Sequence, residues 1–336
     1  MSWSAGIAAL LTSFAVTILL GFVLIPALKR LKFGQTIKEI GPTWHESKNG
    51  TPTMGGLLFI IGIIIGVFVG FVLYEMAMPS NITVNSGENI RLWAGLLAAI
   101  GFGLIGFIDD YIKVAKHRNL GLNAMQKTVF QLVIAICYIA TLQLSGITST
   151  IVVFPFIGQL DFGWFYYPLM VLGIYFIVNA VNLTDGIDGL ASSVTTVYAI
   201  IFMLIATFLQ YYTIHILAAA LAGGCLGFLV WNFYPAKTFM GDTGSMFLGG
   251  CVVALAFGVD LPILILLAGI VYICEALSVV LQVISFKSTG KRIFKMSPIH
   301  HHFEMCGWSE IKIVTVFTAV TVVFGILAII CVFFGL

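Results

Sequence analysis

The stretch Leu92–Ile108, LWAGLLAAIGFGLIGFI, is an apolar run that ends directly in the pair Asp109-Asp110, with Lys113 three residues further on. A run of this kind approaches the ~20 apolar residues that a helix needs to cross a bilayer. Two adjacent carboxylates at the end of such a helix repel each other and lose hydration, so they persist where a cation neutralises them or water reaches them freely. Which of these two conditions holds decides between an enzyme site and an ordinary membrane boundary.

The composition of the whole chain is that of a membrane protein. Of its 336 residues, 60% are hydrophobic and 9% are charged, whereas a soluble domain carries about 25% charged residues. Ten segments are long and apolar enough to span a bilayer: roughly 5–28, 54–74, 92–108, 128–146, 167–183, 190–209, 215–231, 246–258, 262–284 and 312–334. We therefore predict an all-α polytopic membrane protein that forms a single domain over residues 1–336.

Lys and Arg residues are distributed asymmetrically among the loops. Of the 16, only Arg91 lies on one side; the other 15 follow the first, third, seventh and ninth segments. The positive-inside rule places those four loops in the cytoplasm and both termini outside. On the outer side, residues 147–166 alternate apolar and polar side chains with Gly and Pro, which predicts a small hairpin.

Polar residues gather in five stretches, all on the predicted cytoplasmic side. They are KNGTPTMGG at 48–56, IDDYIK at 108–113, NAVNLTDGIDGL at 179–190, WNFYPAKTFMGDTGS at 231–245 and MSPIHHHFE at 296–304. Each stretch alone has an ordinary explanation, such as a capped helix start, a helix-end ion pair, a solvated turn or a basic loop on anionic lipid. Their gathering on one face instead favours a shared site.

The residue types in these stretches suit phosphate chemistry. Asp109 and Asp110 point about 100° apart on a helix, so one can face a site while the other braces it. Asn179 lies inside an apolar segment, where a polar side chain is costly, which favours a functional role. Three consecutive histidines cannot converge on one zinc ion from a regular helix, but beside lysines they suit a phosphate anion. Together with the carboxylates they predict phosphoryl chemistry assisted by Mg²⁺.

The five stretches, in this order, resemble the bacterial phospho-N-acetylmuramoyl-pentapeptide transferases, a family within the polyprenyl-phosphate N-acetylhexosamine-1-phosphate transferases. The resemblance covers essentially the whole chain, and HHHFE at 300–304 points to the muramoyl-pentapeptide branch. It implies transfer of phospho-MurNAc-pentapeptide from UDP-MurNAc-pentapeptide to undecaprenyl phosphate, which gives lipid I and UMP for peptidoglycan synthesis. It further implies Mg²⁺, a homodimer and the bacterial cytoplasmic membrane with the site facing the cytoplasm; no nucleic-acid partner is expected.

The resemblance also implies roles for individual positions. Asp109, Asp110, Asp242 and His301 would be catalytic, with Asp242 as the Mg²⁺ ligand. The substrate-binding residues would be Lys48, Thr53, Lys113, Lys127, Asn179, Asn182, Asp185, Asp188, Asn232, Phe239, His300 and His302. Among these, Lys48, Asp188 and Phe239 would hold the uridine end of the donor.

Several alternatives remain open at this stage. The acceptor phosphate either attacks the donor directly, or an aspartate first forms a covalent phospho-sugar intermediate. Glu275, an acid in the middle of the ninth segment, either pairs internally or faces a groove for the lipid. A transferase that uses UDP-GlcNAc is the near rival, whereas a transporter or flippase would place polar residues along a full transmembrane path.

Overall fold

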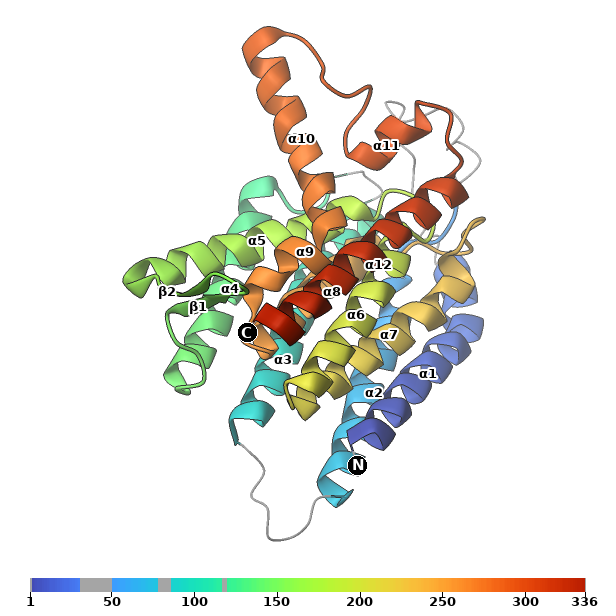
Figure 1. Ribbon diagram of the computed structural model, residues 1–336. Coiled ribbons are helices and arrows are strands. Elements are labelled where there is room, and N and C mark those ends of the chain that lie inside the picture. The colour runs from blue at the N-terminus through green and yellow to red at the C-terminus, as the bar shows by residue number, and fades with distance from the viewer. Residues whose placement is uncertain (1, 31–49, 78–85, 117–119, 336) are drawn as a thin grey trace.

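The computed structural model describes residues 2–30, 50–77, 86–116 and 120–335. Within these ranges the chain forms a helical bundle with one small hairpin (Figure 1). The long helices are α1 (Ser2–Arg30), α2 (Gly56–Ala77), α3 (Ser86–Ala115), α4 (Ala124–Leu144), α5 (Tyr166–Thr184), α6 (Leu190–Phe208), α7 (Tyr212–Asn232), α8 (Gly241–Gly258), α10 (Ile270–Thr289) and α12 (Glu310–Gly335). The shorter elements are β1 (Ile151–Phe154), β2 (Gly158–Asp161), α9 (Ile265–Ala268), α11 (Ile299–Glu304) and 3₁₀ turns at Gly163–Phe165 and Pro262–Leu264.

The predicted membrane architecture is confirmed within the described residues, where ten helices are long and apolar enough to cross a bilayer. The chain is therefore an all-α, multi-pass membrane protein. The hairpin expected within residues 147–166 is also present, because β1 and β2 pair antiparallel with Ile151 opposite Asp161. The prediction of one uninterrupted span over residues 262–284 was wrong. A 3₁₀ turn and α9 precede Gly269, and α10 then continues to Thr289. Uniform apolar composition cannot reveal such a break.

The helices α3 and α8 pack against each other over much of their length, and small residues let their backbones approach closely. A side chain at Gly250 would lie 2.5 Å from the Cα of Ala99, and one at Gly95 would lie 2.8 Å from the Cβ of Ala254. Close packing of this kind stabilises helix pairs in membranes, where lipid removes most of the hydrophobic drive. The pair matters for function because the end of α3 and the start of α8 carry three aspartates.

At the opposite end of this pair, Arg91 at the start of α3 holds the end of α8. Its guanidinium lies 2.7 Å from the Asp260 carboxylate and donates to the carbonyl oxygens of Phe257 and Gly258. It also donates to Ile147 O at 2.7 Å. A buried arginine that satisfies the last carbonyls of a helix fixes the register of the two helices.

The helix α10 projects beyond the rest of the bundle, and α11 lies beside the segment that returns from it (Figure 1). Gln282 stabilises this return, because its amide accepts from the backbone N–H groups of Ile293 and Phe294 and donates to Phe294 O. The return brings the histidines of α11 back to the bundle.

Candidate active site

Three carboxylates converge where α3 ends and α8 begins. Asp109 and Asp110 lie in the last turns of α3, and Asp242 lies in the first turn of α8, which starts five residues before the predicted span. One oxygen from each carboxylate lies within 4.8 Å of the others. Asp109 and Asp110 are 0% and 3% exposed, so charge neutralisation rather than free hydration must stabilise them.

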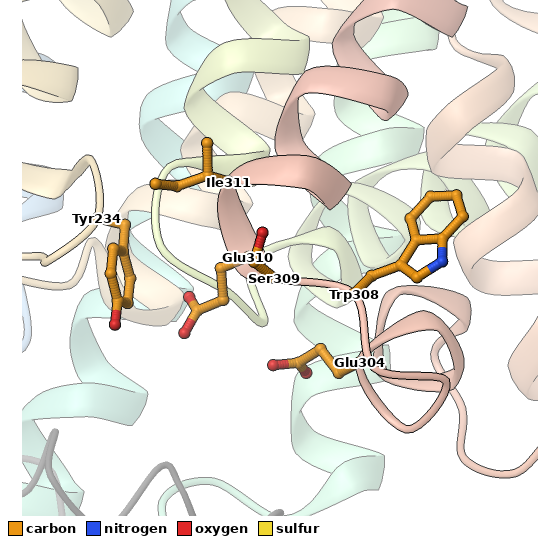
Figure 2. A pocket seen from close by; sticks show the side chains of 6 residues that line it. All are labelled: Tyr234, Glu304, Trp308, Ser309, Glu310 and Ile311. Carbon is orange, nitrogen blue, oxygen red and sulfur yellow. The ribbon is translucent and has the colours of Figure 1, made fainter.

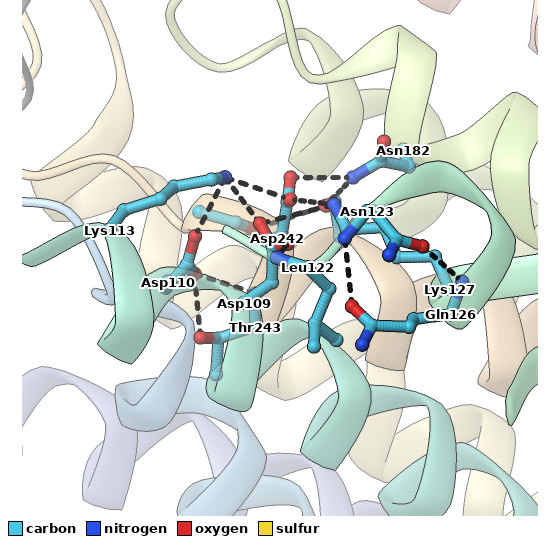
Figure 3. Close-up of polar contacts among 12 residues, drawn as sticks. Asp109, Asp110, Lys113, Leu122, Asn123, Gln126, Lys127, Asn182, Asp242 and Thr243 are labelled. Carbon is cyan, nitrogen blue, oxygen red and sulfur yellow. Dashed lines mark hydrogen bonds and ion pairs between the residues drawn. The ribbon is translucent and has the colours of Figure 1, made fainter. Parts of the chain in front are cut away.

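Two lysines supply much of that neutralisation (Figure 3). Lys113 Nζ lies 2.6 Å from Asp109, 3.0 Å from Asp242 and 3.5 Å from Asp110. Lys127 Nζ lies 2.7 Å from Asp242 and 3.1 Å from Asp109. The predicted pairing of Lys113 with the two aspartates of its own helix is confirmed, and both lysines also reach Asp242.

The start of α4 explains the position of Lys127. Asn123 caps this helix, because its side chain accepts from Gln126 N at 2.7 Å and the Gln126 side chain accepts from Asn123 N at 3.0 Å. Such a reciprocal capping box satisfies two backbone donors and fixes where the helix begins. Lys127 therefore lies in the first turn of α4, within reach of the aspartates (Figure 3).

Each aspartate of α3 is also fixed by hydrogen bonds from elsewhere in the chain. Asp110 accepts from the backbone N–H and the hydroxyl of Thr243, at 2.9 and 2.7 Å, which makes it a brace against α8. Asp109 accepts from Leu122 N at 2.7 Å while its other oxygen faces the lysines. The predicted division between a bracing and a site-facing carboxylate thus corresponds to Asp110 and Asp109.

Close backbone approach requires glycine at two positions here. A Cβ at Gly241 would lie 2.5 Å from Asp110 Oδ2, and one at Gly121 would lie 2.5 Å from the Asp109 carboxyl carbon. Gly241 also has a φ of 69°, in the left-handed region that glycine adopts at no cost.

The asparagines of α5 divide between two partners. Asn182 donates to Asp242 Oδ1 at 3.0 Å and to Ser245 Oγ at 2.7 Å, so it belongs to the carboxylate cluster. Asn179, one turn earlier, donates instead to Gln131 Oε1 at 2.9 Å and to Tyr175 O at 2.7 Å. The polar partner Gln131 was missed, although a glutamine among the apolar residues of α4 was a visible signal.

The turn between α5 and α6 is tied to two neighbouring segments. Asp188 accepts from Ala236 N at 2.9 Å, and its own N–H donates to Glu310 at 3.0 Å. Asn232 accepts from Gly189 N at 3.2 Å and donates to Thr238 O at 3.0 Å. These bonds place Asp188 and Asn232 as fixed parts of the loops around the cluster.

Asp185 has an unusual electrostatic environment in this turn. Burial first, and then the charges of Asp242, Asp110 and Asp188, raise the pKa of Asp185 from 3.8 to about 8. Like charges in a poorly hydrated region disfavour one more ionised carboxylate. The turn is therefore electrostatically coupled to Asp242 and Asp110 of the carboxylate cluster.

The segment before α2 pairs with the segment before α8. Phe239 N donates to Pro52 O at 2.9 Å, and Gly55 N donates to Phe239 O at 2.8 Å. Thr53 lies beside Gly241, where a Cβ would be 2.8 Å from Thr53 Oγ1. Thr53 thus borders the carboxylate cluster. The Phe239 backbone is bonded to residues on both sides of Thr53, whereas Lys48 lies outside the described residues.

The three histidines take different partners, so they do not converge on one ion. His300 Nδ1 lies 3.0 Å from Glu275, and both side chains are 0% exposed. His301 Nδ1 lies 2.6 Å from Glu304, and His302 Nδ1 accepts from Lys295 N at 3.1 Å. The internal pairing considered for Glu275 is confirmed.

A cavity of about 210 Å³ lies between the end of α11 and the start of α12 (Figure 2). It is lined by Tyr234, Glu304, Trp308, Ser309, Glu310 and Ile311. Glu310 connects its wall to the Asp188 turn, and Glu304 connects it to His301. Glu304 entered the sequence analysis only as the end of the HHHFE motif, without a role of its own. Glu310 was missed, because it does not lie in an apolar segment where an acid stands out.

The donor set of the carboxylate cluster fits a hard divalent cation. All three candidate ligands offer carboxylate oxygens, which Mg²⁺ prefers to nitrogen or sulfur. Asp242 is the least enclosed of the three, with 21% of its side chain exposed against 1% for Asp109 and 4% for Asp110. The geometry therefore singles out Asp242 as the carboxylate most accessible to an incoming ion.

Known proteins are similar in sequence to this chain over almost its whole length. A family model described as glycosyl transferase family 4 matches residues 92–260, and phospho-N-acetylmuramoyl-pentapeptide-transferase signature 1 matches residues 48–60. A phospho-N-acetylmuramoyl-pentapeptide-transferase from Halalkalibacterium halodurans is 46% identical over 95% of both chains. One from Acetivibrio thermocellus is 46% identical over 94% of this chain and 92% of its own, and one from Bacillus subtilis is 44% identical over 95% of both. The chain therefore belongs to the family of phospho-N-acetylmuramoyl-pentapeptide transferases.

Proposed function

We propose that this protein transfers phospho-MurNAc-pentapeptide from UDP-MurNAc-pentapeptide to undecaprenyl phosphate, giving lipid I and UMP for peptidoglycan synthesis. The observation that carries the proposal is the cluster of Asp109, Asp110 and Asp242 with Lys113 and Lys127, at one end of a membrane-spanning bundle. Such a site combines cations for phosphate groups with carboxylates for a metal ion. The relatives, which are 44–46% identical to this chain, are named phospho-N-acetylmuramoyl-pentapeptide-transferases.

In the proposed reaction the acceptor phosphate is itself the nucleophile. An oxygen of undecaprenyl phosphate attacks the β-phosphorus of the donor, the new P–O bond forms, and the bond to the bridging oxygen breaks so that UMP leaves. One pyrophosphate bond is exchanged for another, so positioning and charge screening supply most of the catalysis. Lys113 and Lys127 screen the phosphate charges, and Asp109 orients both ammonium groups.

We propose direct transfer rather than a covalent aspartyl intermediate. Asp110 is held on one oxygen by two hydrogen bonds from Thr243, and it is almost fully buried. Asp109 is held by Leu122 N and lies 2.6 Å from an ammonium group. A nucleophilic carboxylate would have to give up these interactions.

In this proposal Asp242 would hold Mg²⁺, which would supply positive charge to neutralise the negative charge that develops on the phosphate groups. Asn182 contributes by fixing the second oxygen of the Asp242 carboxylate. Asp110 holds Thr243, the residue next to Asp242, and so sets the direction of the carboxylate.

The remaining predicted residues would line the donor site. Lys48, Asp188 and Phe239 are proposed to hold the uridine end, with Phe239 stacking on the base. The others proposed to line the cleft or to support its walls are Thr53, Asn179, Asn182, Asp185, Asn232, His300 and His302. His301 is proposed to be catalytic. Support for this group comes from the hydrogen bonds that connect the Asp188 turn, the segment before α8 and the wall of the cavity.

We further propose that the site faces the cytoplasm of a bacterial cell and that the protein works as a homodimer in the cytoplasmic membrane. The first proposal is supported by the 15 Lys and Arg residues that follow the first, third, seventh and ninth apolar segments. Cysteine labelling of an exposed residue on each side in intact cells tests the orientation, and crosslinking in membranes tests the dimer.

The decisive test is a membrane assay that contains the purified protein, undecaprenyl phosphate, Mg²⁺ and UDP-MurNAc-pentapeptide, with release of UMP as the readout. We expect release that depends on both substrates and stops when the metal is chelated. UDP-GlcNAc serves as the matched control donor. Equal release from UDP-GlcNAc would replace the proposed donor by that of the sister transferases, and no release from either would refute the proposal.

A further inference from the structure

Glu275 is a fully buried acid in the membrane-spanning part of α10, and its partner is a fully buried histidine of α11. Glu275 Oε2 lies 3.0 Å from His300 Nδ1 and 3.5 Å from the His300 backbone nitrogen. Both side chains are 0% exposed, so neither faces lipid. The pair connects the helix that projects from the bundle to the histidine segment.

The opposite edge of the His300 ring lies against the turn that follows α5. A Cβ at Gly186 would lie 2.6 Å from His300 Cε1 and closer still to Nε2. Only glycine leaves room for the ring in this position. Gly186 lies between Asp185 and Asp188 in the sequence. The His300 ring therefore supports the turn that carries both acids.

Stability gives no reason for such a pair. Glu275 Oε1 and His300 Nε2 are buried and have no hydrogen-bond partner among the described residues, and each such atom costs free energy. Buried ion pairs are commonly no more stabilising than apolar residues of similar volume. What a carboxylate on Nδ1 does supply is a fixed proton position and a fixed ring orientation.

We propose that Glu275 is a positioning residue that acts through His300. By holding Nδ1, Glu275 keeps the edge of the His300 ring against Gly186. The ring thereby fixes the position of the turn from which Asp185 and Asp188 reach the nucleotide-sugar donor. The inference rests on the proposed function, and it assigns Glu275 to recognition of the soluble donor rather than of the lipid acceptor. Removing the support therefore weakens donor binding and leaves acceptor binding unchanged.

The test uses the full-length protein in lipid nanodiscs with steady-state release of UMP. Glu275→Met removes the acceptor for Nδ1, whereas Glu275→Gln keeps an oxygen that can accept from it. The double variant Glu275→Met/His300→Leu replaces the whole pair by apolar side chains. Ser278→Ala is the matched control, because Ser278 is a buried residue of the same helix that bonds only to the Glu275 backbone oxygen among the described contacts.

We expect Glu275→Met to raise the donor KM by about 10- to 100-fold, with kcat and the acceptor KM within about threefold of wild type. Glu275→Gln should restore most of the donor affinity, and Ser278→Ala should behave as wild type. The double variant separates positioning from stability: we expect its unfolding temperature to recover toward wild type while its donor KM stays raised.

Two results would overturn the inference while leaving the proposed function intact: a normal donor KM in Glu275→Met, or a donor KM that recovers together with stability in the double variant. A wild-type protein that releases no UMP from UDP-MurNAc-pentapeptide would overturn both the proposed function and this inference.

Discussion

The close approach of α3 and α8 makes Gly106 a sensitive position for catalysis. A Cβ at Gly106 would lie 2.6 Å from Thr243 N and closer still to the carbonyl oxygen of Asp242, whereas ordinary contacts begin near 3.4 Å. These are backbone atoms that cannot rotate away, so in Gly106→Ala the two helices must separate by at least about 0.8 Å, the difference between those distances. The separation would fall directly between the aspartates of α3 and Asp242.

A misplacement of this size costs on the order of 10²-fold in rate, and overpacking costs about 1–3 kcal/mol of folding free energy. We therefore expect Gly106→Ala to lower kcat for UMP release by roughly 100-fold. Gly101→Ala is the matched control on the same helix, because there a Cβ would meet only the flexible end of Ile134, at 3.0 Å. Thermal unfolding in detergent checks that both variants fold. If the two variants were equally active, the distance between α3 and α8 would not set the geometry of the site.

Three further predictions concern the charges and the mechanism. Asp242→Ala should abolish UMP release. Asp260→Asn, which alters the ion pair with Arg91 at the far end of α8, should keep activity within about threefold. Similar losses in both variants would contradict the location of the site. The pKa of Asp185 is raised to about 8, so the native state binds more protons than the unfolded state between about pH 4 and 8, and the unfolding temperature should fall as pH rises through that range. Asp185→Asn should flatten this dependence, and an unchanged slope would contradict the raised pKa. Direct transfer predicts no exchange of labelled UMP into the donor when the acceptor is omitted, so exchange at a rate near kcat would indicate a covalent intermediate.

Hydropathy was enough to predict most of the architecture, because the length of an apolar run is a property of composition. It could not predict the interruption at Gly269 or the early start of α8 at Gly241. A break between two apolar stretches leaves no change in composition, and the glycines around Asp242 read equally well as loop or helix. The early start matters, because it turns Asp242 from a loop residue into part of the first turn of a helix.

The candidate site was predicted as a set of residues but not as a set of contacts. The pairing of Lys113 with Asp109 followed from helical spacing alone. The contact of Lys127 with Asp242 and the brace from Thr243 to Asp110 connect residues more than 100 positions apart. Contacts of this kind depend on how closely two helices pack. That distance depends on which glycines lie at the interface, and the interface is visible only in the structure.

The charge balance of the cluster accounts for the two lysines. Three carboxylates and two ammonium groups leave one negative charge, and the N-terminus of α8 offsets part of it where Thr243 N donates to Asp110. With a divalent cation on Asp242 the same cluster would become positive, which is complementary to two substrates that both carry phosphate groups.

Removing one lysine therefore lowers the affinity of the cluster for both substrates. We expect Lys127→Met to raise the KM of donor and acceptor together, each by about tenfold or more, and to reduce the dependence of kcat/KM on ionic strength. Lys237→Met, which removes a cation that lies over the Trp231 ring, is the control. A rise in only one of the two KM values would show that Lys127 serves one substrate, and the shared phosphate site would have to be divided.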